Sequence, residues 1–173
     1  MNTLEASRSR VSKSPPIARL IESIGAGWDD DCDPSLSRYD RIVFLADPDV
    51  DGVHIRSLLL LFFHTWMRPV LDAGMVFTAR PPLWRLTSQR LDEPLYVWSD
   101  KQYHEVLAKL ADQGIQAPNT ERFRGLGNMV PEVLFETCLD PRERTLARLT
   151  AAHAEAAIRS YAQMRAQLSP RSS

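Results

Sequence analysis

Three aspartates alternate in one short run of the chain, and this spacing could bind a divalent metal. The run Asp47-Pro48-Asp49-Val50-Asp51-Gly52 directly follows the apolar stretch at 42–46. Carboxylates this close together repel one another, and a hard divalent cation offsets that cost. Mg²⁺ prefers oxygen ligands and usually takes one or two carboxylates together with waters and phosphate oxygens. The run therefore predicts a Mg²⁺ site, with Mn²⁺ as the alternative ion.

Two other interpretations of the acidic run are open. Asp-x-Asp-x-Asp-Gly also begins the calcium-binding EF-hand loop, but the twelfth position here is Leu58, where that loop needs a glutamate. The run could also be a solvated turn without chemistry. Its surroundings favour a site, because an apolar strand precedes it and His54 and Arg56 open an apolar helix after it. In parallel α/β sheets, ligands bind at the carboxyl ends of the strands.

The elements around the aspartates form a strand–helix–strand pattern. Residues 42–46 are a continuous apolar run, typical of a strand buried on both faces of a parallel sheet. Residues 54–71 are apolar almost all round and predict a buried helix. Residues 75–79 predict a second strand, which two prolines end. The pattern predicts an α/β fold with a right-handed βαβ crossover.

The other segments predict smaller elements on both sides of this unit. We expect a helix over 17–24, a hairpin of strands 83–86 and 94–98, a helix over 100–111 capped by Ser99, a loop over 112–121, a helix over 131–138 and mostly helix over 142–168. The expected organisation has four regions: a lead-in with a short helix and an acidic loop (1–40), the βαβ region (41–82), a hairpin–helix insert (83–121) and a helical tail with glycines (122–173).

Composition limits the kinds of partner that the chain can have. With 173 residues, 44% hydrophobic and 25% charged, it is expected to be soluble and globular. The net charge of −1 provides no overall attraction to nucleic acid, so DNA contact must come from local groups such as Arg122 and Arg124. The longest apolar run is too short to span a membrane, and the two cysteines lack metal-site spacing. These features predict a cytoplasmic protein without a membrane partner.

Four motifs, in order, resemble those of one enzyme family. Residues 41–60 resemble the second half of the TOPRIM domain in the B subunits of bacterial type IIA DNA topoisomerases, DNA gyrase and topoisomerase IV, which carry DxDxDG followed by HIR and a leucine-rich helix. Residues 79–83 are similar to the next strand and its PPL ending, 122–129 to (Y/F)KGLGEM and 136–141 to ETxxDP. The resemblance implies a partial TOPRIM fold, a Rossmann-like parallel sheet with flanking helices, followed by a small hairpin and a mostly helical tail.

The resemblance also implies roles for individual residues. In the family, Mg²⁺ held by the aspartates and an upstream glutamate assists DNA cleavage and religation by a tyrosine of the A subunit. Asp47 and Asp49 match the metal ligands, and Asp51 would support them or bind a second ion. The DNA-binding candidates that the resemblance gives are Arg122, Arg124, Gly125, His54 and Arg56, although a structural role fits the last two equally well. Arg124 replaces the usual lysine and Asn128 the usual acid of the motif.

One family motif has no counterpart in the 173 residues. The upstream EGDSA segment supplies the glutamate, whereas residues 2–7 resemble the family's LNVEKA stretch, which lies after it. We therefore expect the chain to begin inside the TOPRIM domain, to lack a complete catalytic set and not to bind ATP. Neither Glu5 nor Glu22 can fill the glutamate's role, because neither follows a strand beside glycine and small residues.

Two functional hypotheses follow from this sequence. The first is a fragment of the B subunit of an ATP-dependent type II topoisomerase, inactive alone, that works with DNA, the A subunit and a separate chain carrying the ATPase and the first TOPRIM half. The alternative is a stand-alone TOPRIM remnant that acts as a non-catalytic binding or regulatory protein for gyrase, topoisomerase IV or DNA. The choice between gyrase and topoisomerase IV, independent folding and the oligomeric state stay open at this point.

Overall fold

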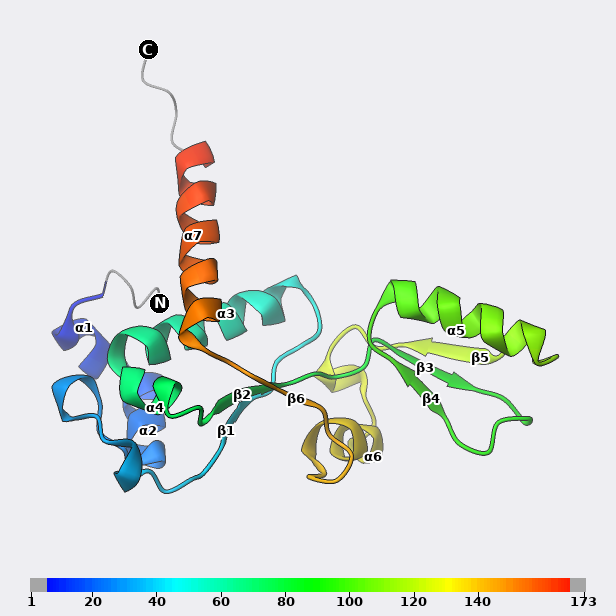
Figure 1. Ribbon diagram of the computed structural model, residues 1–173, viewed down its shortest axis with the longest axis horizontal. Helices are drawn as coiled ribbons and strands as arrows, with labels where there is room; N and C mark the ends of the chain where they lie inside the picture. Colours follow the sequence, from blue (N-terminus) through cyan, green and yellow to red (C-terminus); the bar gives the residue numbers. More distant parts are fainter. Residues whose placement is uncertain (1–5, 169–173) are drawn as a thin grey trace, which may run out of the picture. The chain divides into compact units, whose positions relative to one another are not determined.

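The computed structural model describes residues 6–168, and Figure 1 shows the order of the elements. Two ends of the chain lie outside the described residues: 1–5 of the predicted lead-in, which include Glu5, and 169–173 of the predicted tail. The chain divides into two compact units. The first unit comprises the chain up to Phe44, His54–Thr78 and the chain from Ala147, and the second unit comprises Leu45–Val53 and Ala79–Leu146.

A parallel strand pair confirms the predicted α/β class and its βαβ unit. Strand β1 (Ile42–Phe44) pairs in parallel with β2 (Val76–Ala79), and Ile42 lies opposite Val76. Helices α3 (Val50–Trp66) and α4 (Arg68–Asp72) connect the two strands (Figure 1). Strand β6 (Leu146–Arg148) extends this sheet in the order β1-β2-β6.

The strand and the helix that flank the acidic run differ from their predicted bounds. Strand β1 ends at Phe44, and only Phe44 of its three residues is buried, so the prediction of burial on both faces is wrong. Helix α3 begins at Val50 because the Asp49 side chain accepts the Gly52 N–H and caps the first turn. The predicted single helix over 54–71 is broken at Met67, whose φ of −136° is not helical. Pro69 explains the break, since it cannot donate an N–H to a continuous helix.

Aromatic and aliphatic side chains form the core of the first unit. The buried cluster includes Phe44 from β1, Phe62 and Phe63 from α3, and Val76 from β2. The surrounding elements are α1 (Arg8–Ser12), α2 (Pro15–Ile24), the 3-10 turns η1 (Asp29–Asp31) and η2 (Pro34–Leu36), and α7 (Ala151–Leu168). The helix predicted over 17–24 is confirmed in α2, which ends at Gly25 with φ +80°.

The second unit is built on a small antiparallel sheet of order β4-β3-β5. Strands β3 (Trp84–Thr87) and β4 (Leu95–Val97) confirm the predicted hairpin. The segment predicted as a loop contains β5 (Asn119–Arg122), which pairs with the other side of β3, so that prediction is wrong there. All four β5 residues are exposed and polar, which leaves no alternation for a strand prediction to detect.

Helical elements complete the second unit and lead back to the first. Helix α5 (Asp100–Asp112) has the predicted cap, since the Ser99 hydroxyl accepts the Gln102 N–H at 3.1 Å. The predicted helical segment over 131–138 is confirmed as α6 (Pro131–Leu134) and a π-helical turn, η4 (Phe135–Leu139). The prediction of mostly helix over 142–168 holds only from Ala151, because β6 pairs into the sheet. Within residues 6–168, none of the helices combines the length and apolar character needed to cross a membrane.

Candidate metal and nucleic-acid site

The first aspartate of the acidic run is held by a segment far away in the sequence. Asp47 lies three residues beyond β1 and is partly buried. Its Oδ1 accepts the backbone N–H of Leu126 at 2.6 Å, across 79 residues of sequence. Leu126 opens the 3-10 turn η3 (Leu126–Asn128), which follows Gly125. The structure thus brings the DxDxDG run and the RFRGLG segment together inside the second unit.

The other two aspartates lie at the start of α3. Asp49 is exposed, and its Oδ1 accepts the Gly52 N–H at 2.8 Å. Asp51 is exposed in the first helical turn. Gly52 is buried, and a Cβ atom there would lie 2.0 Å from the carbonyl oxygen of Asp47. The glycine is therefore required because the first turn of α3 lies directly on the main chain of the acidic run.

The donor set suits Mg²⁺ as an open site. The available ligands are carboxylate oxygens, and the exposed side chains of Asp49 and Asp51 leave room for water and phosphate oxygens. Among the described residues, no three His, Cys, Asp or Glu side chains converge as a ready metal-binding group. A Mg²⁺ ion bound to these carboxylates would therefore take its other ligands from water or phosphate oxygens.

A cavity of about 610 Å³ lies beside the acidic run in the second unit. Its lining combines both charges with apolar side chains: Pro48, Asp49, Val50, Val53, Leu83, Asp100, Arg122, Phe123 and Arg124. Phe123 is 2% exposed and fixes the segment between the two arginines in the core. The cavity therefore brings one predicted metal ligand and two of the three predicted DNA-binding arginines to the same space.

The two arginines of this cavity are held differently. Arg122 lies 3.6 Å from the Asp100 carboxylate, and its guanidinium lies 5.4 Å from the centre of the Trp84 ring. The Trp84 indole N–H donates to the same Asp100 carboxylate at 2.9 Å. Arg124 lines the cavity and is exposed. Trp84 and Asp100 were missed as site residues, because their sequence positions indicate only a hairpin strand and the first turn of a helix.

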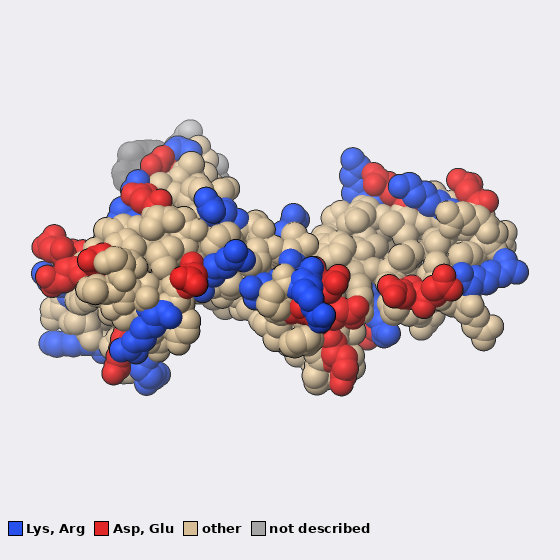
Figure 2. All heavy atoms as spheres, turned by 60° about the horizontal axis from the view of Figure 1, so that its bottom comes forward, with Lys and Arg blue, Asp and Glu red and all other residues tan. Residues whose placement is uncertain are grey.

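His54 and Arg56 do not line this cavity. Both belong to the part of α3 that lies in the first unit, where His54 is exposed and Arg56 is partly buried. Figure 2 shows basic and acidic side chains interspersed over the displayed face. DNA contact would therefore depend on individual arginines, as the net charge of −1 predicts.

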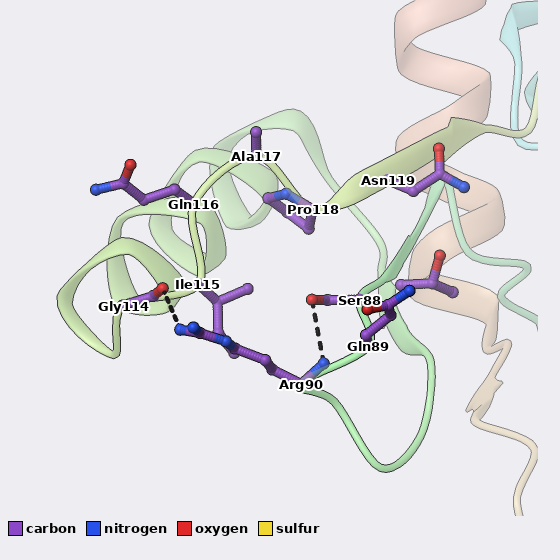
Figure 3. A pocket seen from close by; sticks show the side chains of 10 residues that line it. Ser88, Gln89, Arg90, Gly114, Ile115, Gln116, Ala117, Pro118 and Asn119 are labelled. Atoms are coloured by element: carbon purple, nitrogen blue, oxygen red, sulfur yellow. Dashed lines mark hydrogen bonds between the residues drawn. The ribbon is translucent and has the colours of Figure 1, made fainter.

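A second cavity, of about 760 Å³, lies beyond the end of β3 in the second unit (Figure 3). Arg90 is the charged residue of its lining, and its Nη1 donates to the Gly114 carbonyl at 2.9 Å. The rest of the lining is amide, hydroxyl and small apolar side chains. Its lining residues include the hydroxyls of Thr87 and Ser88 and contain no Asp, Glu, His, Cys or Lys.

Comparison with known proteins supports the family resemblance. Residues 116–172 match the family described as "DNA gyrase B subunit, carboxyl terminus". The chain is 40% identical over 161 residues to the B subunit of DNA gyrase from Thermotoga maritima, which covers 93% of this chain and 24% of that protein. It is 37% identical over 150 residues to the B subunit of DNA gyrase from Halalkalibacterium halodurans. That match covers 87% of this chain and 23% of the relative. It is also 37% identical over 152 residues to the B subunit of DNA topoisomerase 4 from Streptococcus pneumoniae. That match covers 87% of this chain and 23% of the relative.

These matches show that the chain is similar to part of the B subunits of type II DNA topoisomerases. More narrowly, it is related to the B subunits of DNA gyrase and topoisomerase IV, and its residues 116–172 correspond to part of the gyrase B carboxyl terminus. The predicted resemblance is confirmed. The chain spans about a quarter of the length of the curated relatives that it matches.

Proposed function

We propose that this chain supplies the Mg²⁺-binding aspartates of a TOPRIM-type site for DNA cleavage and religation by a type II topoisomerase. The hydrogen bond from Leu126 to Asp47 is the observation that carries the proposal. It joins two motifs that are 79 residues apart at a single carboxylate, beside a cavity that two arginines line. The relatives named DNA gyrase and DNA topoisomerase 4 support the same reaction class.

In this proposal each predicted residue has a separate task. Asp47 and Asp49 bind Mg²⁺ or Mn²⁺, and Asp51 supports them or binds a second ion. The bound metal would stabilise charge on the phosphoryl group and on the leaving oxygen. Arg122 and Arg124 bind DNA phosphates, with His54 and Arg56 as further contacts, and Gly125 allows close approach of the backbone.

The proposed partners are DNA and a topoisomerase A subunit, which supplies the cleaving tyrosine. In this proposal the ATPase and the first TOPRIM half lie outside these 173 residues, and the assembly is cytoplasmic. The 173 residues contain no counterpart of the family's EGDSA motif. These residues alone are therefore expected neither to cleave nor to relax plasmid DNA.

The metal assignment is tested by calorimetric titration with Mn²⁺ and Mg²⁺. Wild-type protein should bind in the millimolar range, because few protein ligands are present. Asp49→Ala should abolish binding, whereas Asp31→Ala, in the acidic segment of the first unit, should leave it unchanged. Equal binding by Asp49→Ala and wild type would remove the site assignment. Binding to the A subunit without any metal affinity would favour the alternative, a non-catalytic binding or regulatory protein.

The partner assignment is tested by co-purification with a topoisomerase A subunit, followed by DNA binding over a salt series. If Arg124 contacts a phosphate, Arg124→Ala should reduce the slope of log affinity against log salt by about one. Arg90→Ala is the matched control, since Arg90 lines the other cavity. Identical slopes for Arg124→Ala and wild type would exclude Arg124 as a DNA contact, and failure to co-purify would exclude the A subunit as the partner.

A further inference from the structure

We infer that the backbone of Gly125 and Leu126 positions the Asp47 carboxylate, so that metal affinity at the acidic run depends on this distant turn. The inference rests on the proposed metal site and adds two positioning residues to it. Neither residue supplies a metal-binding side chain. Their effect on the metal would pass entirely through the placement of Asp47.

The hydrogen bond that carries this inference is short and joins a neutral donor to a charged acceptor. Leu126 N lies 2.6 Å from Asp47 Oδ1, and the pair is partly buried. Hydrogen bonds to an ionised carboxylate are stronger than bonds between neutral groups. One carboxylate oxygen of Asp47 is therefore fixed by the main chain, which also fixes the direction of the whole group.

Gly125 is needed for space next to this carboxylate. Its backbone is extended, with φ −170° and ψ 168°, which any residue can adopt. A Cβ atom at this position would lie 3.1 Å from Oδ1 and 3.3 Å from Cγ of Asp47. An alanine would therefore leave the backbone unstrained and push against the carboxylate. Displacement of Asp47 is the specific consequence of that substitution.

The turn that donates the hydrogen bond is itself fixed. Asn128 N donates to the Gly125 carbonyl at 3.0 Å, and Met129 N donates to the Leu126 carbonyl at 3.1 Å. The Leu126 side chain packs against the cluster of Phe123, Met129 and Val133. A donor held in this way is in place before a metal arrives, as partners behind metal ligands usually are.

Two neighbouring glycines provide a matched test. Gly125→Ala should weaken Mn²⁺ binding by up to about 10- to 100-fold, the range typical of mutations in the groups that orient a metal ligand. Gly127→Ala should keep the wild-type affinity, because nothing lies within 4 Å of a Cβ atom at that position. Circular dichroism and urea unfolding of both variants would show that the comparison is made between folded proteins. A purely structural role of Gly125 would lower stability and leave the Mn²⁺ affinity of the folded protein unchanged.

A second pair of variants tests the N–H itself. Leu126→Pro removes the donor at the first position of a 3-10 turn, where the extended residue before it is compatible with proline. Leu126→Ala removes the same side chain and keeps the N–H. We expect weaker Mn²⁺ binding for Leu126→Pro than for Leu126→Ala. Equal affinities in this pair would overturn the role of the hydrogen bond.

A measurement without metal separates this inference from the proposed function. The Leu126 amide proton should exchange slowly with solvent in wild type and at least about tenfold faster in Asp47→Ala, since a hydrogen-bonded amide exchanges only when it opens. Wild-type protein that binds no Mn²⁺ would overturn the proposed metal site. In that case, faster amide exchange at Leu126 in Asp47→Ala would still support the contact between Leu126 and Asp47. Mn²⁺ affinity that is equal in Gly125→Ala and wild type would overturn the inference and leave the metal site standing.

Discussion

The two acidic segments of this chain are similar in composition and differ in what binds their carboxylates. The segment at 29–33 contains four aspartates, and the run at 47–51 contains three. In the first segment, Arg8 lies 3.2 Å from the Asp29 carboxylate and 3.9 Å from that of Asp31. The Ser35 N–H donates to Asp33 at 2.9 Å. Three of the four aspartates therefore have a partner within the first unit.

The run at 47–51 is connected to a distant part of the sequence. Asp47 accepts a hydrogen bond from Leu126, 79 residues away, and Asp49 lines a cavity together with Arg124. The number of acids would favour the first segment as a metal site, and the long-range contact favours the second. The connections of a carboxylate therefore indicate a site better than the local density of charge.

Steric requirements are the same in both segments. A Cβ atom on Gly27 would lie 2.4 Å from the Asp31 carbonyl oxygen, and one on Gly52 would lie 2.0 Å from the Asp47 carbonyl oxygen. Each segment therefore needs a glycine packed against its own main chain. Because each glycine lies against a main-chain carbonyl, substitutions at the two glycines can separate folding from metal binding.

The largest expected effect is on stability and is shared by both segments. Gly52→Ala should lower the free energy of unfolding by about 3 kcal/mol, because the added methyl group overlaps a main-chain carbonyl. Gly27→Ala should cost at least as much, since Gly27 also has φ +68° in the left-handed region. Urea unfolding measures both values, with Gly127→Ala as the unaffected control.

Mn²⁺ titration of the folded fraction then tests the difference between the segments. Gly52→Ala should lose affinity because it moves Asp47, and Gly27→Ala should retain the wild-type value. Loss of Mn²⁺ affinity in both variants would break the comparison, because the first segment would then also contribute to the metal site. Wild-type stability of Gly52→Ala would contradict the close approach of α3 to Asp47.

Local sequence pattern was sufficient for the elements that hold the site. The apolar runs at 42–46 and 75–79, the hairpin and the Ser99 cap all follow from periodicity and turn chemistry, and the structure confirms them within a few residues. Strand β5 was not predictable in this way. Its four polar, exposed residues form a strand only because β3 offers a free edge, and a tertiary contact of this kind overrides local propensity.

The same division applies to the candidate site. Alternating aspartates and motif resemblance singled out Asp47, Asp49, Asp51, Arg122, Arg124 and Gly125 before the fold was known. The position of Leu126 against Asp47 and the grouping of Trp84 and Asp100 around Arg122 could not be predicted, because each depends on segments that approach only in the folded chain. The residues could thus be named from the sequence, and their connections could not.

The smallest expected effect is on the pH dependence of stability and concerns Asp140, a carboxylate outside both segments. It tests whether a carboxylate that is bonded only to sequence neighbours affects stability without affecting metal binding. The Arg142 side chain donates to Asp140 at 2.7 and 3.1 Å, and its backbone N–H donates at 2.9 Å. These bonds lower the pKa of Asp140 from 3.8 to about 2. The folded-state pKa is depressed, so this pair stabilises the folded chain above about pH 4 and loses its effect as the pH falls toward 2.

Asp140→Asn should therefore flatten the fall in unfolding free energy between about pH 4 and 2, as measured by urea unfolding at a series of pH values. The change should be small, because solvent screens the Arg142 side chain, which is 82% exposed, even though the Asp140 side chain is only 8% exposed. Asp33→Asn should flatten the same profile less, since Ser35 is the main group that lowers the pKa of Asp33.

Neither variant should alter Mn²⁺ affinity, because both carboxylates are satisfied by neighbours within two residues. A pH profile of Asp140→Asn that runs parallel to wild type would contradict the role of Arg142, and altered Mn²⁺ affinity in either variant would show that locally satisfied carboxylates also take part in the metal site.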